Sequence, residues 1–295
     1  MCAAHVADER NFRSAYYEKV GCKNVEERKS LEILLKEKIL DRVKLKQFCL
    51  RYSLPATYRN TVWKICLGVL PVNTDCHAFI NDQRKQEFHE MMRALTIMKL
   101  IDFNTAKIKQ FYAGFLLQTD SLRFENNFNS SRGFNEIVQF LLPLYKDDVE
   151  VYWIAKGFFS NLHSFDNDFP KLIESIIHYI EKEEPILYKH LKSIDALDNI
   201  PFDYYFDTFF SNTLNYPALT KIWDKLCGGS CNIFVFVFVS LLIHLKHVIL
   251  KCRCLKDVLE NLNKVNEDNA EVIFNKAIDM WQQGSHFNVH DKPKT

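Results

Sequence analysis

One long apolar stretch dominates the hydrophobic pattern of the chain. Between Leu219 and Leu250 its densest part runs from Ile233 to Ile243, where every residue except Ser240 is apolar. An element with this pattern is apolar on all sides and is expected at the centre of a core, with other elements packed around it. The stretch is therefore the predicted organising element of the fold.

Local propensity and sequence context disagree about the conformation of this stretch. Its alternating β-branched and aromatic residues, IFVFVFV, are typical of a strand. We nevertheless predict a helix, because Gly228–Gly229 ends the preceding segment and no turn with a matching strand flanks the run. A membrane span is the remaining alternative. It is disfavoured because His244, Lys246 and His247 interrupt the run before the roughly 20 residues that a span requires.

The amino-terminal part of the chain has apolar residues at helical spacing. One helix is predicted from Glu26 to Leu40 and a second from Leu40 to Tyr52. A third is predicted between Leu54 and Pro71, with Thr57 as its amino-terminal cap and Gly68 and Pro71 ending it. The buried stripe expected on this third helix consists of Val62, Ile65, Cys66 and Val69.

The composition favours a helical globular protein. The 295 residues are 47% hydrophobic, with 24 phenylalanines but only eight glycines and eight prolines, which suits long helices. The 38 basic and 37 acidic residues give a formal net charge of +1, so the whole-chain charge gives no reason to expect nucleic acid or an anionic membrane as a partner. We predict an amino-terminal arm at 1–20, an all-α domain at 21–284 and a tail at 285–295.

The cysteines do not predict a metal site. The amino terminus lacks the apolar region of a secretory signal, so we expect a cytoplasmic protein whose nine cysteines are thiols. Cys227 with Cys231 and Cys252 with Cys254 are closely spaced pairs, but neither has a second pair at zinc-finger spacing. We interpret them as buried apolar residues and predict neither a metal nor a cofactor.

Several short motifs occur along the chain in a definite order and spacing. The motif residues are Leu54–Pro55, Tyr58–Arg59, Trp63, Leu67–Gly68, Pro185, Leu187, His190–Leu191, Phe206, Phe209, Ile222–Trp223–Asp224, Gly229 and Ile233–Phe234. With these motifs the chain resembles, over roughly 31–281, the TBC domains, the helical modules that stimulate GTP hydrolysis by Rab GTPases. Lys221 stands where the family usually has an arginine. The resemblance implies an all-α, two-lobed fold, and its structural motif residues would be Arg59, Trp63, Trp223 and Asp224.

The resemblance also implies an arginine finger, in a motif I-x-x-D-x-x-R. Such a finger neutralises charge on the transferred phosphoryl group and is worth about 10³ to 10⁵ in rate. No arginine occurs from Ala94 to Leu122. With Asp102 as the motif's aspartate, Thr105 takes the place of the arginine and carries no charge. Lys107 and Lys109 follow, but they lack the planar guanidinium fork.

The second catalytic motif of the family, Y-x-Q, is also missing. One alignment places Ser130–Asn135 beside it and puts Arg132 where the glutamine belongs. Gln118 and Gln139 do not follow a tyrosine at the required spacing. The sequence therefore predicts a TBC fold without catalytic residues. An active Rab GTPase-activating protein that uses unconventional residues is the alternative.

An apolar stripe offers a candidate partner surface. We predict a helix at Thr105–Gln118 whose apolar residues recur at helical spacing. They either pack inward or, if the helix lies at the edge of the fold, receive a partner helix. The stripe consists of Ile108, Phe111, Tyr112 and Phe115.

Three further stretches read NFRSAYYEKVG, KSLEILLK and GSCNIFVFV. They are most similar to one branch of the family, whose members belong to the tuberous sclerosis complex. This resemblance implies direct binding to a coiled coil of hamartin and association with tuberin, whose action on the GTPase Rheb restrains TOR signalling. It also implies a cytoplasmic protein recruited to lysosomal or vesicle membranes through the complex. If the chain is instead an active Rab GTPase-activating protein, its expected partner is a Rab GTPase.

Overall fold

The computed structural model describes residues 25–122, 132–165, 168–265 and 267–284. Within these ranges the chain is helical and has no β-strand; an isolated bridge pairs Ile39 with Asn73. The predicted all-α class is confirmed. The arm predicted at 1–20 and the tail predicted at 285–295 lie outside the described residues.

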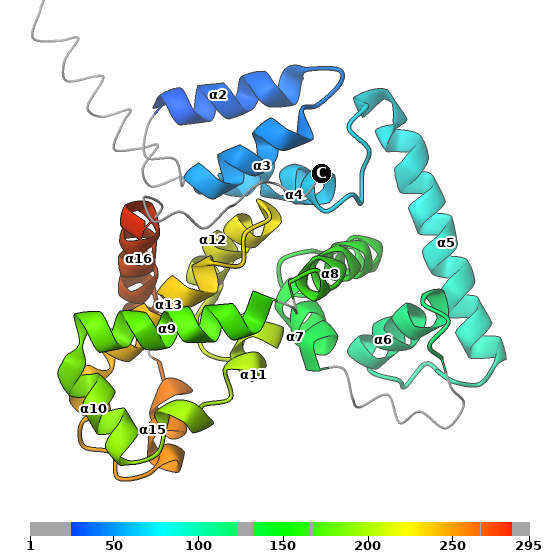
Figure 1. Cartoon of the computed structure of the whole chain (residues 1–295). Helices are drawn as coiled ribbons and strands as arrows, with labels where there is room; N and C mark the ends of the chain where they lie inside the picture. The colour runs from blue at the N-terminus through cyan, green and yellow to red at the C-terminus, as the bar shows by residue number, and fades with distance from the viewer. Residues whose placement is uncertain (1–24, 123–131, 166–167, 266, 285–295) are drawn as a thin grey trace, which may run out of the picture. The chain divides into compact units, whose positions relative to one another are not determined.

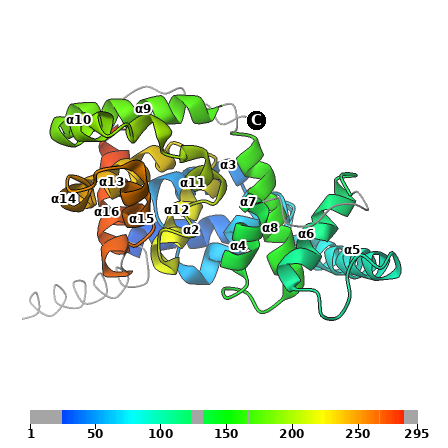
Figure 2. The ribbon, with the colours of Figure 1, turned by 90° about the horizontal axis from the view of Figure 1, so that it is seen from below.

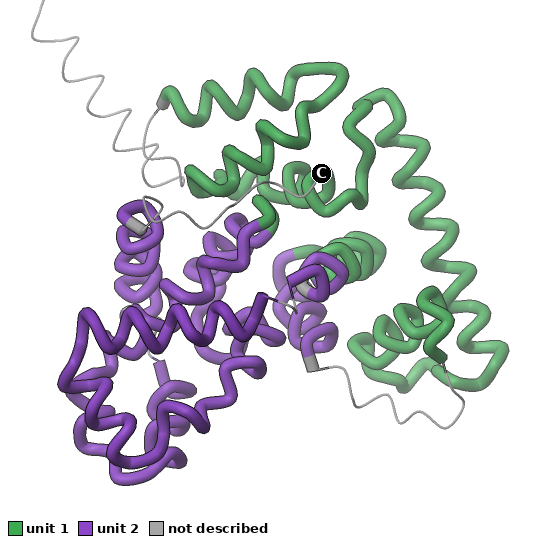
Figure 3. Tube along the Cα trace, in the orientation of Figure 1, with its two compact units in different colours: residues 1–128, 145–158, 227–229 green, residues 129–144, 159–226, 230–295 purple. Residues whose placement is uncertain are grey.

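The chain folds as two compact units, which Figure 3 shows in different colours. Unit 1 comprises residues 1–128, 145–158 and 227–229. Unit 2 comprises residues 129–144, 159–226 and 230–295. Each unit therefore combines segments that are distant in the sequence.

Unit 1 is built from paired helices (Figure 1). Among them, α2 contacts α3, α3 contacts α4, and α5 contacts α6. Its elements are α2 (Val25–Lys36), α3 (Arg42–Arg51), α4 (Ala56–Cys66), the short 3-10 helix η1 (Thr74–Cys76), α5 (His77–Ile97), α6 (Lys107–Gln118) and the first part of α8 (Asp148–His163).

The structure corrects two predicted helix boundaries in unit 1. The first helix ends at Lys36 and does not reach Leu40, because the next helix has its own cap: the Asp41 carboxylate accepts a hydrogen bond from the backbone N–H of Lys44 at 3.0 Å. Thr57 is not the cap of α4, which starts at Ala56 directly after a proline. The stop predicted at Gly68 is confirmed, since this glycine has φ +76°, a conformation that favours glycine.

Unit 2 surrounds the helix predicted to organise the fold. Its elements are α7 (Arg132–Leu141), the last part of α8, α9 (Phe169–Glu183), α10 (Pro185–Ser193), the short 3-10 helix η3 (Leu197–Asn199), α11 (Phe202–Asp207), most of α12 (Tyr216–Cys227), α13 (Ile233–His244), α14 (Lys246–Ile249), α15 (Leu255–Leu262) and α16 (Glu267–Gly284).

Helix α13 is the core of unit 2, as predicted. Every residue from Ile233 to Leu242 is buried, and α13 contacts both α9 and α16 (Figures 1 and 2). The single polar residue, Ser240, is satisfied because its hydroxyl donates to the backbone oxygen of Ile273 on α16 at 3.1 Å. Helix α13 covers the whole apolar run from Ile233 to Ile243 and ends at His244, and α14 follows as a separate turn.

The membrane span and the metal site, which the sequence analysis considered and disfavoured, can be compared with this fold. No helix in the described ranges is long and apolar enough to cross a membrane. Cys227, Cys231 and Cys252 are buried as predicted, whereas Cys254 is exposed, so the prediction of burial was wrong for this cysteine. In the described part of the chain no three His, Cys, Asp or Glu residues are grouped so that they could hold a metal ion.

Candidate functional site

The turn before α6 occupies the place where the resemblance expects an arginine finger. There the Thr105 hydroxyl donates to the Asp102 carboxylate at 2.6 Å and accepts from the backbone N–H of Asp102 at 2.9 Å. The same carboxylate accepts from the backbone N–H of Asn104 at 3.1 Å. The hydrogen bond from Thr105 lowers the pKa of Asp102, so this carboxylate is ionised at neutral pH. The polar groups of this turn are thus bonded to one another.

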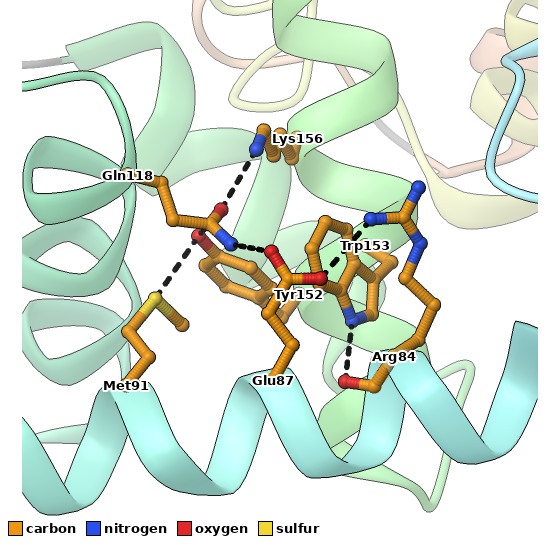
Figure 4. Close-up of polar contacts among 7 residues, drawn as sticks. All are labelled: Arg84, Glu87, Met91, Gln118, Tyr152, Trp153 and Lys156. Atoms are coloured by element: carbon orange, nitrogen blue, oxygen red, sulfur yellow. Dashed lines mark hydrogen bonds and ion pairs between the residues drawn. The ribbon is translucent and has the colours of Figure 1, made fainter.

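Gln118, at the end of α6, lies in a polar network that joins three helices (Figure 4). Its side-chain oxygen accepts from the Tyr152 hydroxyl at 2.6 Å and from the Lys156 ammonium at 2.7 Å. Its side-chain nitrogen donates to the Glu87 carboxylate at 2.7 Å. Tyr152 and Lys156 belong to α8 and Glu87 to α5, so Gln118 is committed to contacts inside unit 1.

Burial makes the α8 members of this network structural groups. It raises the pKa of Tyr152, which is therefore a neutral donor across the physiological pH range, and its hydroxyl also lies 3.5 Å from the sulfur of Met91. Burial lowers the pKa of Lys156, with Glu87 acting in the opposite direction. A neutral tyrosine and an ammonium that donate to one amide oxygen supply hydrogen bonds and no nucleophile.

Arg84 is the arginine of α5 nearest to this network, and it too is held internally (Figure 4). Its guanidinium lies 4.0 Å from the ring centroid of Trp153, and one of its nitrogens is 3.3 Å from the Glu87 carboxylate. The Trp153 indole N–H donates to the Arg84 backbone oxygen at 3.1 Å. The stacking on Trp153 holds this guanidinium against α8, and the ion pair with Glu87 fixes it on α5. Arg93, also on α5, is exposed.

A cavity of about 260 Å³ lies beside Arg84 in unit 1. Lys64 forms an ion pair with Glu150 at its wall, and the Lys64 side chain is largely buried. The charged lining residues are Lys64, Arg84, Lys85, Asp82, Asp147 and Glu150. Positive and negative side chains are thus balanced, and the cavity offers no excess positive charge for a phosphate group.

The resemblance assigned structural roles to Arg59 and Trp63, and both make internal contacts. Arg59 donates to the backbone oxygen of Leu54 at 2.6 Å, and its guanidinium lies 6.0 Å from the Trp63 ring centroid. Trp63 is fully buried and packs edge-on against Phe158 with ring centroids 5.0 Å apart. In unit 2, Trp223 and Asp224 are fully buried.

The four residues of the α6 stripe are not equally accessible. Phe111 is 1% exposed and Tyr112 is also buried, while Ile108 and Phe115 are half-buried. Phe111 faces inward because it completes an aromatic cluster: its ring centroid lies 5.6 Å from that of Phe88 on α5 and 6.1 Å from that of Tyr152 on α8. The inward-packing alternative thus describes Phe111 and Tyr112, and partner binding by the stripe stays a prediction.

The second catalytic motif is described only in part. Ser130 and Ser131 lie outside the described residues, and so does the side chain of Arg132, the first residue of α7. Gln139 is exposed and lines a cavity of about 80 Å³ in unit 2. Sequence reasoning missed the Gln118 network, because its contacts join residues 31 to 38 positions apart and have no local signal.

Comparisons with known proteins identify the family of the chain. The model of the Rab-GTPase-TBC domain matches residues 122–250. The chain is 36% identical over 286 residues to TBC1 domain family member 7 of Xenopus tropicalis, covering 96% of this chain and 98% of the relative. It is 33% identical to the Homo sapiens protein of the same name, with the same coverage.

Solved structures show the same fold at low sequence identity. The Ypt/Rab-GAP domain of Gyp1p superposes with a TM-score of 0.60 at 14% identity, covering 88% of this chain and 98% of that chain. The Chlamydomonas flagellar RabGAP TBC domain superposes with a TM-score of 0.59 at 16% identity, covering 93% of this chain and 94% of that chain. At these identities the likeness concerns the fold alone.

Proposed function

The chain belongs to the family of TBC1 domain proteins that includes member 7, and on this premise we propose that it is a non-catalytic TBC subunit of a larger GTPase-activating complex. Its task is then to bind a partner and support the complex, and the hydrolysis of GTP is accelerated by another subunit. The identified relatives support the family, and the internal contacts of unit 1 support the loss of catalysis.

One observation carries the non-catalytic assignment. Where the family resemblance expects an arginine finger, the chain has Thr105, and its hydroxyl is bonded to Asp102. A threonine cannot place positive charge on a phosphoryl group, and this charge accounts for about 10³ to 10⁵ in rate. Gln118 cannot orient a water in trans while it keeps its bonds to Tyr152 and Lys156.

The proposed partner is a coiled coil of hamartin, and tuberin is associated through the complex. This part rests on the branch of the family that the sequence resembles. In such a complex tuberin supplies the GTPase activation of Rheb, and the present chain contributes to restraining TOR signalling. Recruitment to lysosomal or vesicle membranes then occurs through the complex.

We propose the α6 stripe as the partner-binding face, with different roles for its members. Ile108 and Phe115 retain accessible surface and would touch the apolar seam of the coiled coil. Phe111 and Tyr112 would hold α6 in place through their buried contacts within unit 1. The pattern of two accessible residues on a supported helix suits a partner helix that lies along α6.

Binding assays on single variants test this face. We expect Ile108→Asp and Phe115→Asp each to weaken binding to the hamartin coiled coil by about 2 kcal/mol or more, because a carboxylate would lose its water without gaining a partner. Isothermal titration calorimetry measures the affinity, and circular dichroism checks that the melting temperature is preserved. The matched control is Ile33→Asp on α2, an isoleucine that is 64% exposed. Equal affinities for wild type and both α6 variants would refute the proposed face.

A further inference from the structure

The turn between α5 and α6 exposes two large apolar side chains in unit 1. Phe103 is 100% exposed and Ile97, at the end of α5, is 69% exposed. Neither side chain contributes to the core or to the network around Gln118, so the proposed function gives them no role.

Hydrogen bonds hold the Phe103 backbone in one conformation. The residues on either side of it, Asp102 and Asn104, are joined because the Asp102 carboxylate accepts from the Asn104 N–H. The backbone N–H of Thr105 also donates to the Asp102 backbone oxygen at 3.2 Å. The turn is therefore closed on both sides of the phenylalanine, which is presented from an ordered backbone at a low entropic cost of binding.

Three lysines flank this turn in the sequence. Lys99, Lys107 and Lys109 are exposed, and Asp102 is the one acidic residue between Met98 and Lys109 in the sequence. Lys107 is paired with Asp148 at 2.8 Å. Lys99 adopts the left-handed conformation, φ +58°, at a position after a helix where glycine is favoured. The turn is thus locally basic although the whole chain has a net charge of only +1.

The position of the turn within unit 1 leaves it accessible. Helix α5 runs from His77 to Ile97, and the turn lies at the end of α5 that is remote from η1 and α4 (Figure 1). A helix of this length is about 30 Å long. The tip is therefore far from the α2–α4 part of unit 1.

We propose that the α5–α6 turn is a membrane contact, which inserts Phe103 into the interface of an anionic phospholipid surface while Lys99 and Lys109 face the headgroups. An apolar tip flanked by cations matches the layering of such a surface, where the apolar boundary lies beneath negative headgroups. A protein pocket is the less favoured occupant, because an aromatic anchor in a protein interface is usually ringed by further contacts that exclude water. Here charged and polar residues flank the tip.

The contact is weak when it acts alone. Each lysine near an anionic surface contributes about fivefold to partitioning. One phenylalanine and two lysines that form no ion pair within the described residues therefore give reversible binding, as expected of one signal among several. The proposed membrane contact is made by Phe103, Lys99 and Lys109, none of which carries the proposed loss of catalysis; the two proposals share only Asp102 and Thr105, which hold the turn.

Vesicle co-sedimentation of the full chain tests the proposal. The probes are vesicles of equimolar phosphatidylserine and phosphatidylcholine, compared with pure phosphatidylcholine vesicles. We expect wild type to bind the anionic vesicles and not the neutral ones, and Phe103→Asp to reduce binding about tenfold or more. Phe79→Asp is the matched control, since Phe79 lies on the first turn of α5, at the other end of this helix from the α5–α6 turn, and is 64% exposed; it should bind like wild type.

Two further measurements distinguish insertion of Phe103 into the membrane from electrostatic attraction of the lysines and from binding to a protein. The double variant Lys99→Gln/Lys109→Gln should abolish the dependence of vesicle binding on salt concentration. In the variant Phe103→Trp, brominated lipid should quench the tryptophan fluorescence. The proposal would be overturned if wild type did not bind anionic vesicles. It would also be overturned if Phe103→Asp and Phe79→Asp lost vesicle binding to the same extent. Loss of hamartin binding in Phe103→Asp without any vesicle binding by wild type would identify the turn as a protein anchor and would also overturn it.

Discussion

Replacing Phe111 by aspartate is expected to unfold unit 1. The side chain is 1% exposed and sits in an aromatic cluster with Phe88 and Tyr152. Loss of a buried phenylalanine ring costs about 3 to 5 kcal/mol. An unpaired carboxylate in the same place costs several kcal/mol more, unless it takes up a proton. The sum approaches the whole stability of a domain, about 5 to 15 kcal/mol.

Thermal and urea denaturation followed by circular dichroism measure this effect. Phe103→Asp is the control with the same chemical change on the adjoining turn, where the side chain is 100% exposed, and its melting temperature should match wild type. A folded Phe111→Asp variant with wild-type stability and no partner binding would contradict the inward packing of this residue. It would then support an exposed stripe that includes Phe111.

Trp63→Ala should lower the free energy of unfolding by about 3 to 5 kcal/mol, because a large cavity would remain where the indole was. Trp63 is fully buried, with Phe158 packed edge-on against it and the Arg59 guanidinium over its ring. Trp63→Phe fills part of the same space and should cost less. Urea denaturation gives both values, and a loss below about 1 kcal/mol for Trp63→Ala would show that the site collapses or is solvated.

The fold was largely predictable because it depends on periodic apolar residues. The stretch from Ile233 to Ile243 predicted a central helix despite its strand-like composition, and the structure has α13 there. The Gly228–Gly229 pair and the uniform apolar character outweighed local β propensity, since an element that is apolar on all sides gains from packing in either conformation. The misplaced end of the first helix reflects a capping interaction by Asp41 that overrides the apolar spacing around Leu40.

For the candidate site, the sequence predicted only that the catalytic arginine and glutamine of the family are missing. A missing arginine and the placement of Thr105 can be read along the chain, because the family motif is local in sequence. The direction in which the α6 stripe faces cannot be read in this way. Helical spacing groups Phe111 with Phe115, yet the burial of Phe111 depends on Phe88 and Tyr152, which belong to other helices. The bonds of Gln118 depend on the same tertiary arrangement.

Single-turnover GTP hydrolysis by a panel of Rab GTPases, with and without the purified chain, tests the central claim most directly. The claim predicts rates that change no more than a few-fold, because no arginine finger is placed where the family has one and Gln118 is held internally. A functional arginine finger raises the rate of GTP hydrolysis by a factor of about 10³ to 10⁵. A stimulation of about a hundredfold that is lost in Arg84→Ala, Arg93→Ala or Arg132→Ala would contradict the account and establish an active Rab GTPase-activating protein.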